Sequence, residues 1–256
     1  MISYIKQGAL VIFLALAFGG ALAAVQTQLG PMIEANQKRE TLQAIPSLMA
    51  LGQKLPDDAI VKINADKMEI NVKVPVEGGE PKLMFTEVVR KIDVPNSPKT
   101  KLFEIKVLTP AMAQLIEKKA ITPDQIPVLG YMIEAYGMGF ADKIVTLVGV
   151  DKTCSWITGV YVLDQKETPG LGDKIRGVWA NQYAGMECKT PLQVVKGLKK
   201  PAAGDAVTSA SMLGAIDAIG GATISSQAVT DIVNKAVKDV RNALSAMKPK
   251  GGSDAN

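Results

Sequence analysis

The sequence predicts an α+β domain, with an antiparallel or mixed sheet and flanking helices, behind a single N-terminal transmembrane helix. Three observations support this fold class. An uncharged apolar run fills residues 8–25, alternating strand patterns recur between residues 68 and 163, and an amphipathic helix runs to about Leu244. The 256 residues suffice for one domain of ordinary size with extensions.

The apolar run at residues 8–25 is long enough to cross a bilayer as a helix. A cleaved signal peptide, with Ala21-Leu-Ala23 as its cleavage site, is the alternative. The run exceeds the apolar core of an ordinary signal peptide, which favours an uncleaved, single-pass anchor. Lys6 and the amino terminus favour a cytoplasmic start. We therefore expect the inner (cytoplasmic) membrane, with the remaining chain on the extracytoplasmic, periplasmic side.

Helix and strand patterns follow one another after the anchor. Residues 27–55 predict a stalk helix whose apolar stripe Pro46 interrupts, and Met68–Val74 alternates as a half-buried strand. Further strands are predicted at 82–92, 102–108, 144–150, 155–163 and 193–196, short helices at 110–119 and 179–183, and loops at 96–98, 136–139 and 201–212.

The composition excludes several kinds of chemistry. The chain has no histidine, which removes the usual general base and most zinc sites. Its two cysteines, Cys154 and Cys188, cannot fully ligate an iron–sulfur cluster. In an oxidising compartment they could pair or remain separate thiols, and the sequence favours neither. We expect no catalytic side chain and no metal site, so that an organic cofactor must carry any redox chemistry. The charges are scattered, so no nucleic-acid partner is expected.

Two glycine-rich loops are the candidate binding elements. The stretch Asp217–Ser226 places two glycines and several hydroxyls ahead of the last helix, where backbone N–H groups and the helix dipole favour an anion. An ordinary turn followed by a capping Ser225 or Ser226 is the alternative. The loop Glu167–Gly172 is weak evidence alone, but the two loops together allow a phosphate at the helix start and a planar ring over a glycine-rich backbone.

Both motifs resemble those of a known family. The run Glu167-Thr-Pro-Gly-Leu-Gly-Asp-Lys-Ile175, upstream of Gly221-Ala-Thr-Ile-Ser-Ser226, resembles the FMN-binding domain of the G subunit of the Rnf ion-translocating electron-transport complex. The related C subunit of the sodium-translocating NADH:quinone reductase shares both motifs. With this resemblance, the chain divides into an anchor at 1–27, a stalk helix and accessory α/β region at 28–129, an FMN-binding domain at 130–246 and a disordered tail at 247–256.

The resemblance implies that Thr223 carries FMN as a phosphoester, formed by a dedicated flavin transferase. Where the family has Ser or Thr, this chain has Gly220. Lys196 is a candidate for positive charge near the flavin ring, or else a solvated lysine. Trp179 and Tyr183 are expected in the core. The other implied cofactor-binding residues are Gly221, Ala222, Ser225 and Ser226 near the phosphate, Glu167, Thr168, Gly170, Leu171 and Gly172 near the ring, and Gly137.

The function implied by the resemblance is electron transfer in an ion-translocating ferredoxin:NAD oxidoreductase complex, with the other members of the complex as partners. Three alternatives stay open. They are the C subunit of the quinone reductase, a stand-alone anchored FMN electron carrier, and a non-redox module that binds a phosphorylated ligand at the helix start.

Overall fold

The computed structural model describes residues 2–49, 58–77, 79–94, 100–198 and 214–247. They divide into two compact units, Met1–Glu40 and Thr41–Asn256. The predicted loops at 96–98 and 201–212 and nearly all of the predicted tail lie outside the described residues.

Helix α1 (Ile2–Met49) contributes to both units. Among the described residues it is the one helix long and apolar enough to cross a membrane, because an 18-residue window within Val11–Pro46 has a mean hydropathy of 1.7. A signal sequence would satisfy the same test. Pro46 lies within the helix and does not end it. The last turns, from Thr41 onward, belong to the second unit and bury three leucine or isoleucine side chains: Leu42, Ile45 and Leu48.

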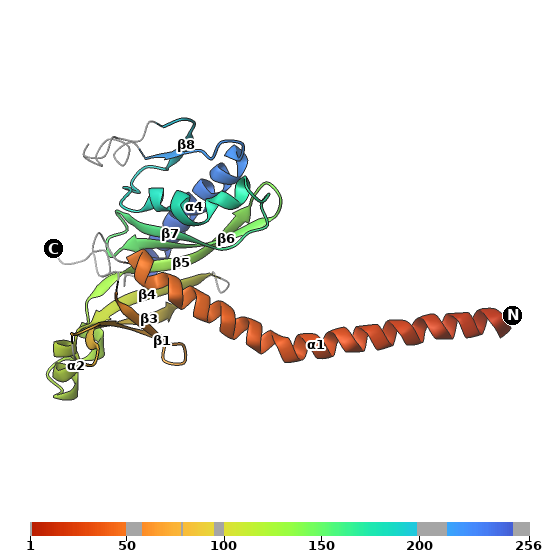
Figure 1. Cartoon of the computed structure of the whole chain (residues 1–256), viewed down its shortest axis with the longest axis horizontal. Coiled ribbons are helices and arrows are strands. Elements are labelled where there is room, and N and C mark those ends of the chain that lie inside the picture. The colour runs from red at the N-terminus through yellow and green to blue at the C-terminus, as the bar shows by residue number, and fades with distance from the viewer. Residues whose placement is uncertain (1, 50–57, 78, 95–99, 199–213, 248–256) are drawn as a thin grey trace, which may run out of the picture. The chain divides into compact units, whose positions relative to one another are not determined.

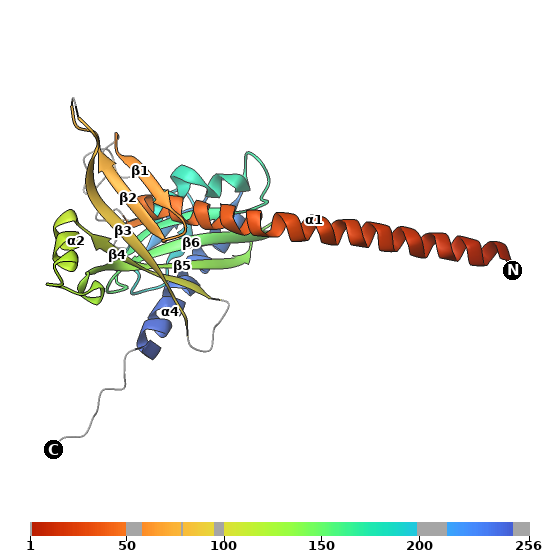
Figure 2. The same cartoon turned by 90° about the horizontal axis from the view of Figure 1, so that it is seen from below.

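The second unit is built on one seven-stranded antiparallel sheet, whose strands are hydrogen-bonded in chain order from β1 to β7 (Figures 1 and 2). The strands are β1 (Ile60–Asn64), β2 (Glu69–Val74), β3 (Lys82–Ile92), β4 (Lys101–Leu108), β5 (Val128–Met138), β6 (Lys143–Asp151) and β7 (Ile157–Asp164). Between β4 and β5 lie α2 (Pro110–Glu117) and a 3₁₀ turn, η1 (Pro123–Gln125).

After β7 the chain forms the elements that surround the candidate loops. Two 3₁₀ helices, η2 (Gly172–Ile175) and η3 (Gly177–Tyr183), are followed by β8 (Gln193–Val195), β9 (Ala215–Asp217) and α4 (Thr223–Met247). Strands β8 and β9 pair in parallel as a separate small sheet. The predicted α+β class, with a mostly antiparallel sheet and flanking helices, is confirmed.

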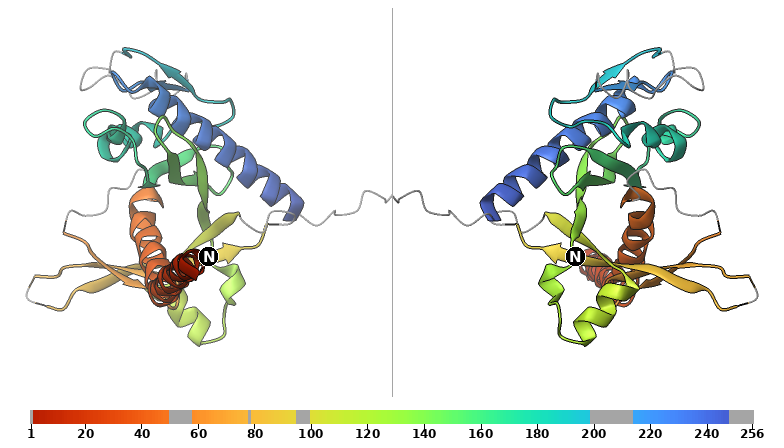
Figure 3. Two further views of the ribbon diagram at one scale, coloured as in Figure 1. Left: turned by 90° about the vertical axis from the view of Figure 1, so that its right-hand side faces the viewer. Right: turned by 90° about the vertical axis from the view of Figure 1, so that its left-hand side faces the viewer.

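The large sheet carries a hydrophobic cluster on each face, because side chains alternate along its strands. Ile133 of β5 packs in the cluster under α4, whereas its neighbour Met132 packs in the cluster under the last turns of α1. Helix α4 and the end of α1 therefore cover opposite faces of the sheet, and Figure 3 shows α4 crossing one of them.

Most predicted elements are found, but the loop predicted at Tyr136–Gly139 is wrong, since Tyr136, Gly137 and Met138 end strand β5. Strands β1, β5 and β9 were not predicted. Strand β5 also runs across the division placed at residue 130, and that division stays a prediction. Both cysteines are buried free thiols, and the Cys188 thiol donates to the carbonyl oxygen of Cys154 at 3.2 Å.

Candidate functional site

The carboxylate of Glu167 joins three segments that lie far apart in the sequence. Its side chain is buried, with 4% of its surface exposed. Oε1 accepts the backbone N–H of Ala141 at 3.0 Å, and Oε2 accepts the hydroxyl of Ser225 in the first turn of α4. The turn after β5, the Glu167–Gly172 loop and the start of α4 are therefore held at one point.

Glu167 is held in its ionised form at neutral pH. Burial by itself would raise the pKa of this carboxyl group. The hydroxyl of Ser225 and the backbone N–H groups of Ala141, Phe140 and Asp142 outweigh that effect and lower the pKa of Glu167 below its ordinary value. A charged carboxylate with several donors is a strong anchor for loops that have little apolar surface to bury.

Glycine is required where these segments approach Glu167. A Cβ at Gly172 would lie 2.8 Å from both the Glu167 Cβ and the Ser225 Oγ, closer than real Cβ atoms come. A Cβ at Gly139 would overlap the Glu167 carboxylate itself. Close packing against Glu167 thus explains why residue 172, which ends the predicted Glu167–Gly172 loop, is glycine.

The Gly220-Gly221 pair forms a tight turn that leads directly into α4. The N–H of Ala222 donates to the carbonyl of Ile219 at 2.9 Å, and Gly221 has φ +81°. A positive φ at the third residue alone is the mark of a type II turn, which glycine favours. The Ser226 hydroxyl accepts the Ile219 N–H and donates to the Ala222 carbonyl, both at 3.0 Å, and so fixes the turn.

Helix α4 begins at Thr223, so the alternative in which Ser225 or Ser226 caps the helix is wrong. Both serines lie in the first turn, buried, with hydroxyls bound to Glu167 and to the preceding turn. The first N–H groups of a helix have no partner within it, and the dipole is positive there. Thr223 is half-buried at this end. The site can therefore bind an anion beside a threonine hydroxyl.

Exposed apolar side chains come from the same three segments. Phe140 lies in the turn after β5, Leu171 in the Glu167–Gly172 loop and Ile224 beside Thr223, and they are 66%, 44% and 59% exposed. Leu171 is next to the glycine turn, because a Cβ on Gly221 would lie 3.2 Å from its Cδ2. Gly170, with φ +76°, faces open space. A ligand with both an anionic group and an apolar ring fits this combination.

Three other residues predicted to bind the cofactor, Thr168, Gly137 and Lys196, lie in three different parts of the fold. The Thr168 carbonyl accepts the N–H groups of Leu171 at 3.1 Å and Asp173 at 3.3 Å, which closes the loop. Gly137 packs against α4, since a Cβ there would lie 2.7 Å from Ile232 Cγ1. Lys196 is exposed after β8, and no contact with the three segments is found for it among the described residues. Its role stays a prediction.

Trp179 and Tyr183 are core residues, as predicted. The Trp179 indole donates to the Asp217 carbonyl at 2.8 Å, and the fully buried Tyr183 hydroxyl lies 2.8 Å from the Thr230 hydroxyl. Their rings meet edge to face with centroids 5.7 Å apart. Phe140 and Ile224 were missed as site residues, because a single exposed apolar side chain in a sequence does not indicate a binding surface.

The comparisons with known proteins agree with this geometry. Residues 139–238 match the FMN-binding domain family. This range contains all three segments that meet at Glu167, and it lies within the region predicted to bind FMN.

Relatives in several organisms are named as G subunits. The chain is 36% identical over 116 residues to the G subunit of the Na⁺-translocating ferredoxin:NAD⁺ oxidoreductase complex of Acetobacterium woodii, covering 45% of this chain and 51% of the relative. It is 37% identical over 110 residues to the G subunit of the ion-translocating oxidoreductase complex of Methanosarcina acetivorans, covering 43% and 50%. The chain thus spans about half the length of these relatives. The predicted resemblance to the G subunit is confirmed.

A solved structure is also similar. The crystal structure of Shewanella oneidensis NqrC aligns with 83% of this chain and 99% of its own, at 19% identity and a TM-score of 0.47.

Proposed function

We propose that this chain is a membrane-anchored electron-transfer protein of a larger complex and carries FMN esterified to Thr223. The observation that carries the proposal is the meeting of three segments at Glu167, around the first turn of α4 and inside the FMN-binding match. FMN supplies the redox chemistry when bound. The chain itself binds and orients the cofactor.

The phosphate is assigned to the start of α4. The Gly220-Gly221 turn, fixed by Ser226, presents the helix N-terminus without a large side chain in front of it. Forming the ester joins the Thr223 oxygen to the phosphorus of an activated FMN phosphoanhydride supplied to the transferase. The bond from that phosphorus to the leaving phosphate oxygen breaks, and the threonine proton leaves with the displaced group. The remaining phosphate charge is stabilised by the helix N–H groups and dipole. The residues proposed for the phosphate are Thr223, Gly221, Ala222, Ser225 and Ser226. Ser226 acts through the turn that it fixes, and Ser225 acts through its bond to Glu167.

The ring is assigned to the Glu167–Gly172 loop. Leu171 and Gly170 offer an exposed apolar side chain and an open backbone, and Phe140 lies in the neighbouring turn. Glu167 and Gly172 act by holding this surface in place. Lys196 remains the proposed cation near the ring.

The wider role is proposed from the relatives. Relatives named as G subunits belong to ion-translocating oxidoreductase complexes, which supports membership of such a translocase, with its other members and a flavin transferase as partners. The apolar segment of α1 supports an anchor in the inner membrane. We place the FMN domain on the extracytoplasmic side. A relative named as the C subunit of the Na⁺-translocating NADH-quinone reductase is less similar, at 27% identity over 128 residues.

Intact mass and in-gel fluorescence test the covalent link. The full chain, co-expressed with a flavin transferase, should be heavier by one FMN unit and fluoresce on a denaturing gel. Thr223→Val should lose both signals, whereas the matched control Thr190→Val, at an exposed threonine outside the three segments, should keep the attached flavin. A Thr223→Val protein that keeps flavin through denaturation contradicts the assignment.

Purification from native membranes tests complex membership separately. Co-purification with multi-spanning and iron–sulfur proteins is expected. A flavin-loaded chain that purifies alone in mild detergent would favour the stand-alone carrier, and a chain that never takes up flavin would favour the phosphate-binding module.

A further inference from the structure

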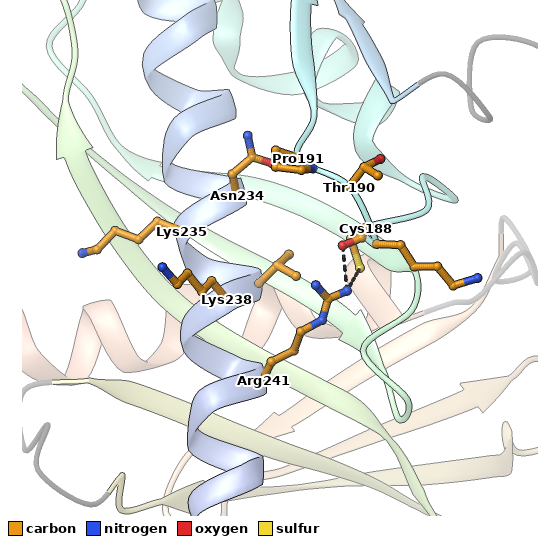
Figure 4. A pocket seen from close by; sticks show the side chains of 9 residues that line it. Cys188, Thr190, Pro191, Asn234, Lys235, Lys238 and Arg241 are labelled. Carbon is orange, nitrogen blue, oxygen red and sulfur yellow. Dashed lines mark hydrogen bonds between the residues drawn. The ribbon is translucent and has the colours of Figure 1, made fainter.

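A second candidate binding region lies on the C-terminal half of α4, away from the flavin site. A pocket opens between this helix and the segment at residues 188–191 (Figure 4). Thr223 is 15 residues before Lys238 on α4, which at 1.5 Å per residue is a separation of about 22 Å. None of the nine described lining residues is acidic, and four are cationic: Lys189, Lys235, Lys238 and Arg241.

Arg241 is fixed in the pocket wall by carbonyl groups, and no ion pair joins it to a carboxylate among the described residues. Its Nη2 donates to the carbonyl oxygens of Cys154 at 2.8 Å and Cys188 at 2.6 Å, and Figure 4 shows the guanidinium turned toward Cys188. Carbonyl groups satisfy hydrogen bonds but carry no net charge. Burial raises the pKa of the Cys154 thiol to about 11 and raises that of Cys188, so both thiols are neutral at physiological pH. The Arg241 charge is therefore not neutralised by the groups that hold it.

The lysines add charge that is only weakly compensated. Lys189 pairs with Glu187 at 2.6 Å, but both side chains are substantially exposed, and such pairs contribute little. The Lys235 ammonium lies 5.9 Å from the centre of the Tyr136 ring, which carries no net charge. No ion pair joins Lys238 to any described residue.

The helix dipole does not account for these cations. Favourable dipole interactions are confined to the last turn of a helix. Helix α4 ends at Met247 and has no basic residue in its last turn, whereas Lys235, Lys238 and Arg241 lie earlier. Their spacing of three residues places them close together along the helix surface, where like charges repel one another. An anionic partner that binds here reduces the repulsion among Lys235, Lys238 and Arg241.

We propose that this cationic pocket docks an acidic, carboxylate-bearing segment of a partner protein across α4. A protein segment fits better than a single phosphate, because Lys235 and Arg241 are about 9 Å apart along the helix axis. The pocket also offers apolar contacts from Pro191 and Val237 beside the charges. Arginine is enriched at protein interfaces, and complementary charges give such contacts their specificity. The proposal does not depend on the flavin.

Fluorescence anisotropy of the full-length, flavin-loaded chain in a neutral detergent tests the proposal. The probe is a dye-labelled peptide of alternating glutamate and alanine, and its glutamine counterpart serves as the uncharged control. Lys238→Glu should weaken binding of the glutamate peptide about tenfold or more. Arg241 is left unchanged, because its bonds to two carbonyl groups support the fold.

The matched control is Lys118→Glu on the exposed end of α2, which changes net charge equally and should alter binding less than about twofold. Equal weakening by both substitutions would show non-specific attraction and overturn the proposal, as would absence of peptide binding to the unchanged chain. Two further arms test other occupants. One arm measures binding to phosphatidylglycerol vesicles, and the other measures binding of inorganic phosphate. If either binds only when Lys238 is present and the peptide does not bind, the pocket is reassigned to a lipid surface or to a free anion, respectively.

Discussion

Replacing Glu87 with glutamine should remove most of the pH dependence of the domain's stability between about pH 4.5 and 7. Glu87 lies in β3 with 2% of its surface exposed, and its Oε2 has no hydrogen-bond partner among the described residues. Its register neighbours are Ile70 in β2 and Val107 in β4, which offer no charge. Burial raises the pKa of Glu87 from 4.5 to about 7.

The sign and size of the effect follow from proton linkage. Because the folded state binds the proton more tightly, Glu87 costs nothing below about pH 4.5, where it is protonated in both states. The free energy of unfolding then falls as the pH rises, until the folded-state pKa of about 7 is passed. At about 1.4 kcal/mol for each unit of pH, the loss is about 3 kcal/mol at pH 8.

Denaturant unfolding of the full chain, followed by the fluorescence of Trp156 and Trp179, measures this loss. The unchanged chain should lose about 2.5 kcal/mol between about pH 5 and 8, whereas Glu87→Gln should be nearly flat and more stable at the higher pH. Glu80→Gln, in an exposed turn, is the matched control and should behave like the unchanged chain. A slope in Glu87→Gln as steep as in the unchanged chain would refute the reasoning.

Three further outcomes concern the flavin site, each measured by the same unfolding assay. Ser225→Ala should cost about 1.5–3 kcal/mol, because it removes a hydrogen bond to the buried Glu167 carboxylate. Gly137→Ala should cost about 1–3 kcal/mol by overpacking against Ile232, whereas Gly220→Ala should change stability by less than about 0.5 kcal/mol, since nothing lies within 4 Å of the added Cβ. Because the pKa of Glu167 is lowered in the folded state, its contribution to the free energy of unfolding is present above its unfolded-state pKa and is lost as the pH falls through its folded-state pKa. Glu167→Gln should abolish that acid-dependent loss of stability.

Each of these outcomes can fail in a definite way. Ser225→Ala should be compared with Ser245→Ala on the exposed side of α4, and equal effects would mean that the bond to Glu167 contributes nothing special. If Gly137→Ala and Gly220→Ala lower the free energy of unfolding equally, overpacking against Ile232 does not determine the cost at residue 137. The Glu167 comparison is best made in the Glu87→Gln background, so that only one buried carboxylate titrates. An acid-dependent loss that persists there in Glu167→Gln argues against Glu167 as its source.

The sequence predicts the strands with regular alternation well, but not β5. Gly130 and Gly137 interrupt its pattern, and glycines of this kind favour a loop in a local interpretation. In the structure β5 pairs on both sides, with β4 and β6, and those hydrogen bonds outweigh the weak local preference. Gly137 is there because α4 packs closely over it, a contact with Ile232 that lies 95 positions further along the chain.

The two loops of the candidate site are predictable from the sequence, but the contact that joins them is not. Glycines and hydroxyls ahead of a helix are a local signal, and so they indicate both loops. The bond from Ser225 to Glu167 spans 58 residues, and no local pattern contains it. For the same reason Ser225 resembles a helix cap in the sequence, although its hydroxyl binds a distant carboxylate.

The uninterrupted ladder from β1 to β7 has a consequence for dissecting the protein. Strand β4 pairs with β5 from Lys101–Glu134 to Lys106–Val128, across the division expected at residue 130. A fragment that begins there would retain the flavin loops but expose a long row of unpaired N–H and C=O groups along β5. Such an open edge recruits strands from other chains. The strands before β5 thus protect the part that carries the proposed flavin loops from self-association, and separating the two parts should yield aggregates in place of a small soluble fragment.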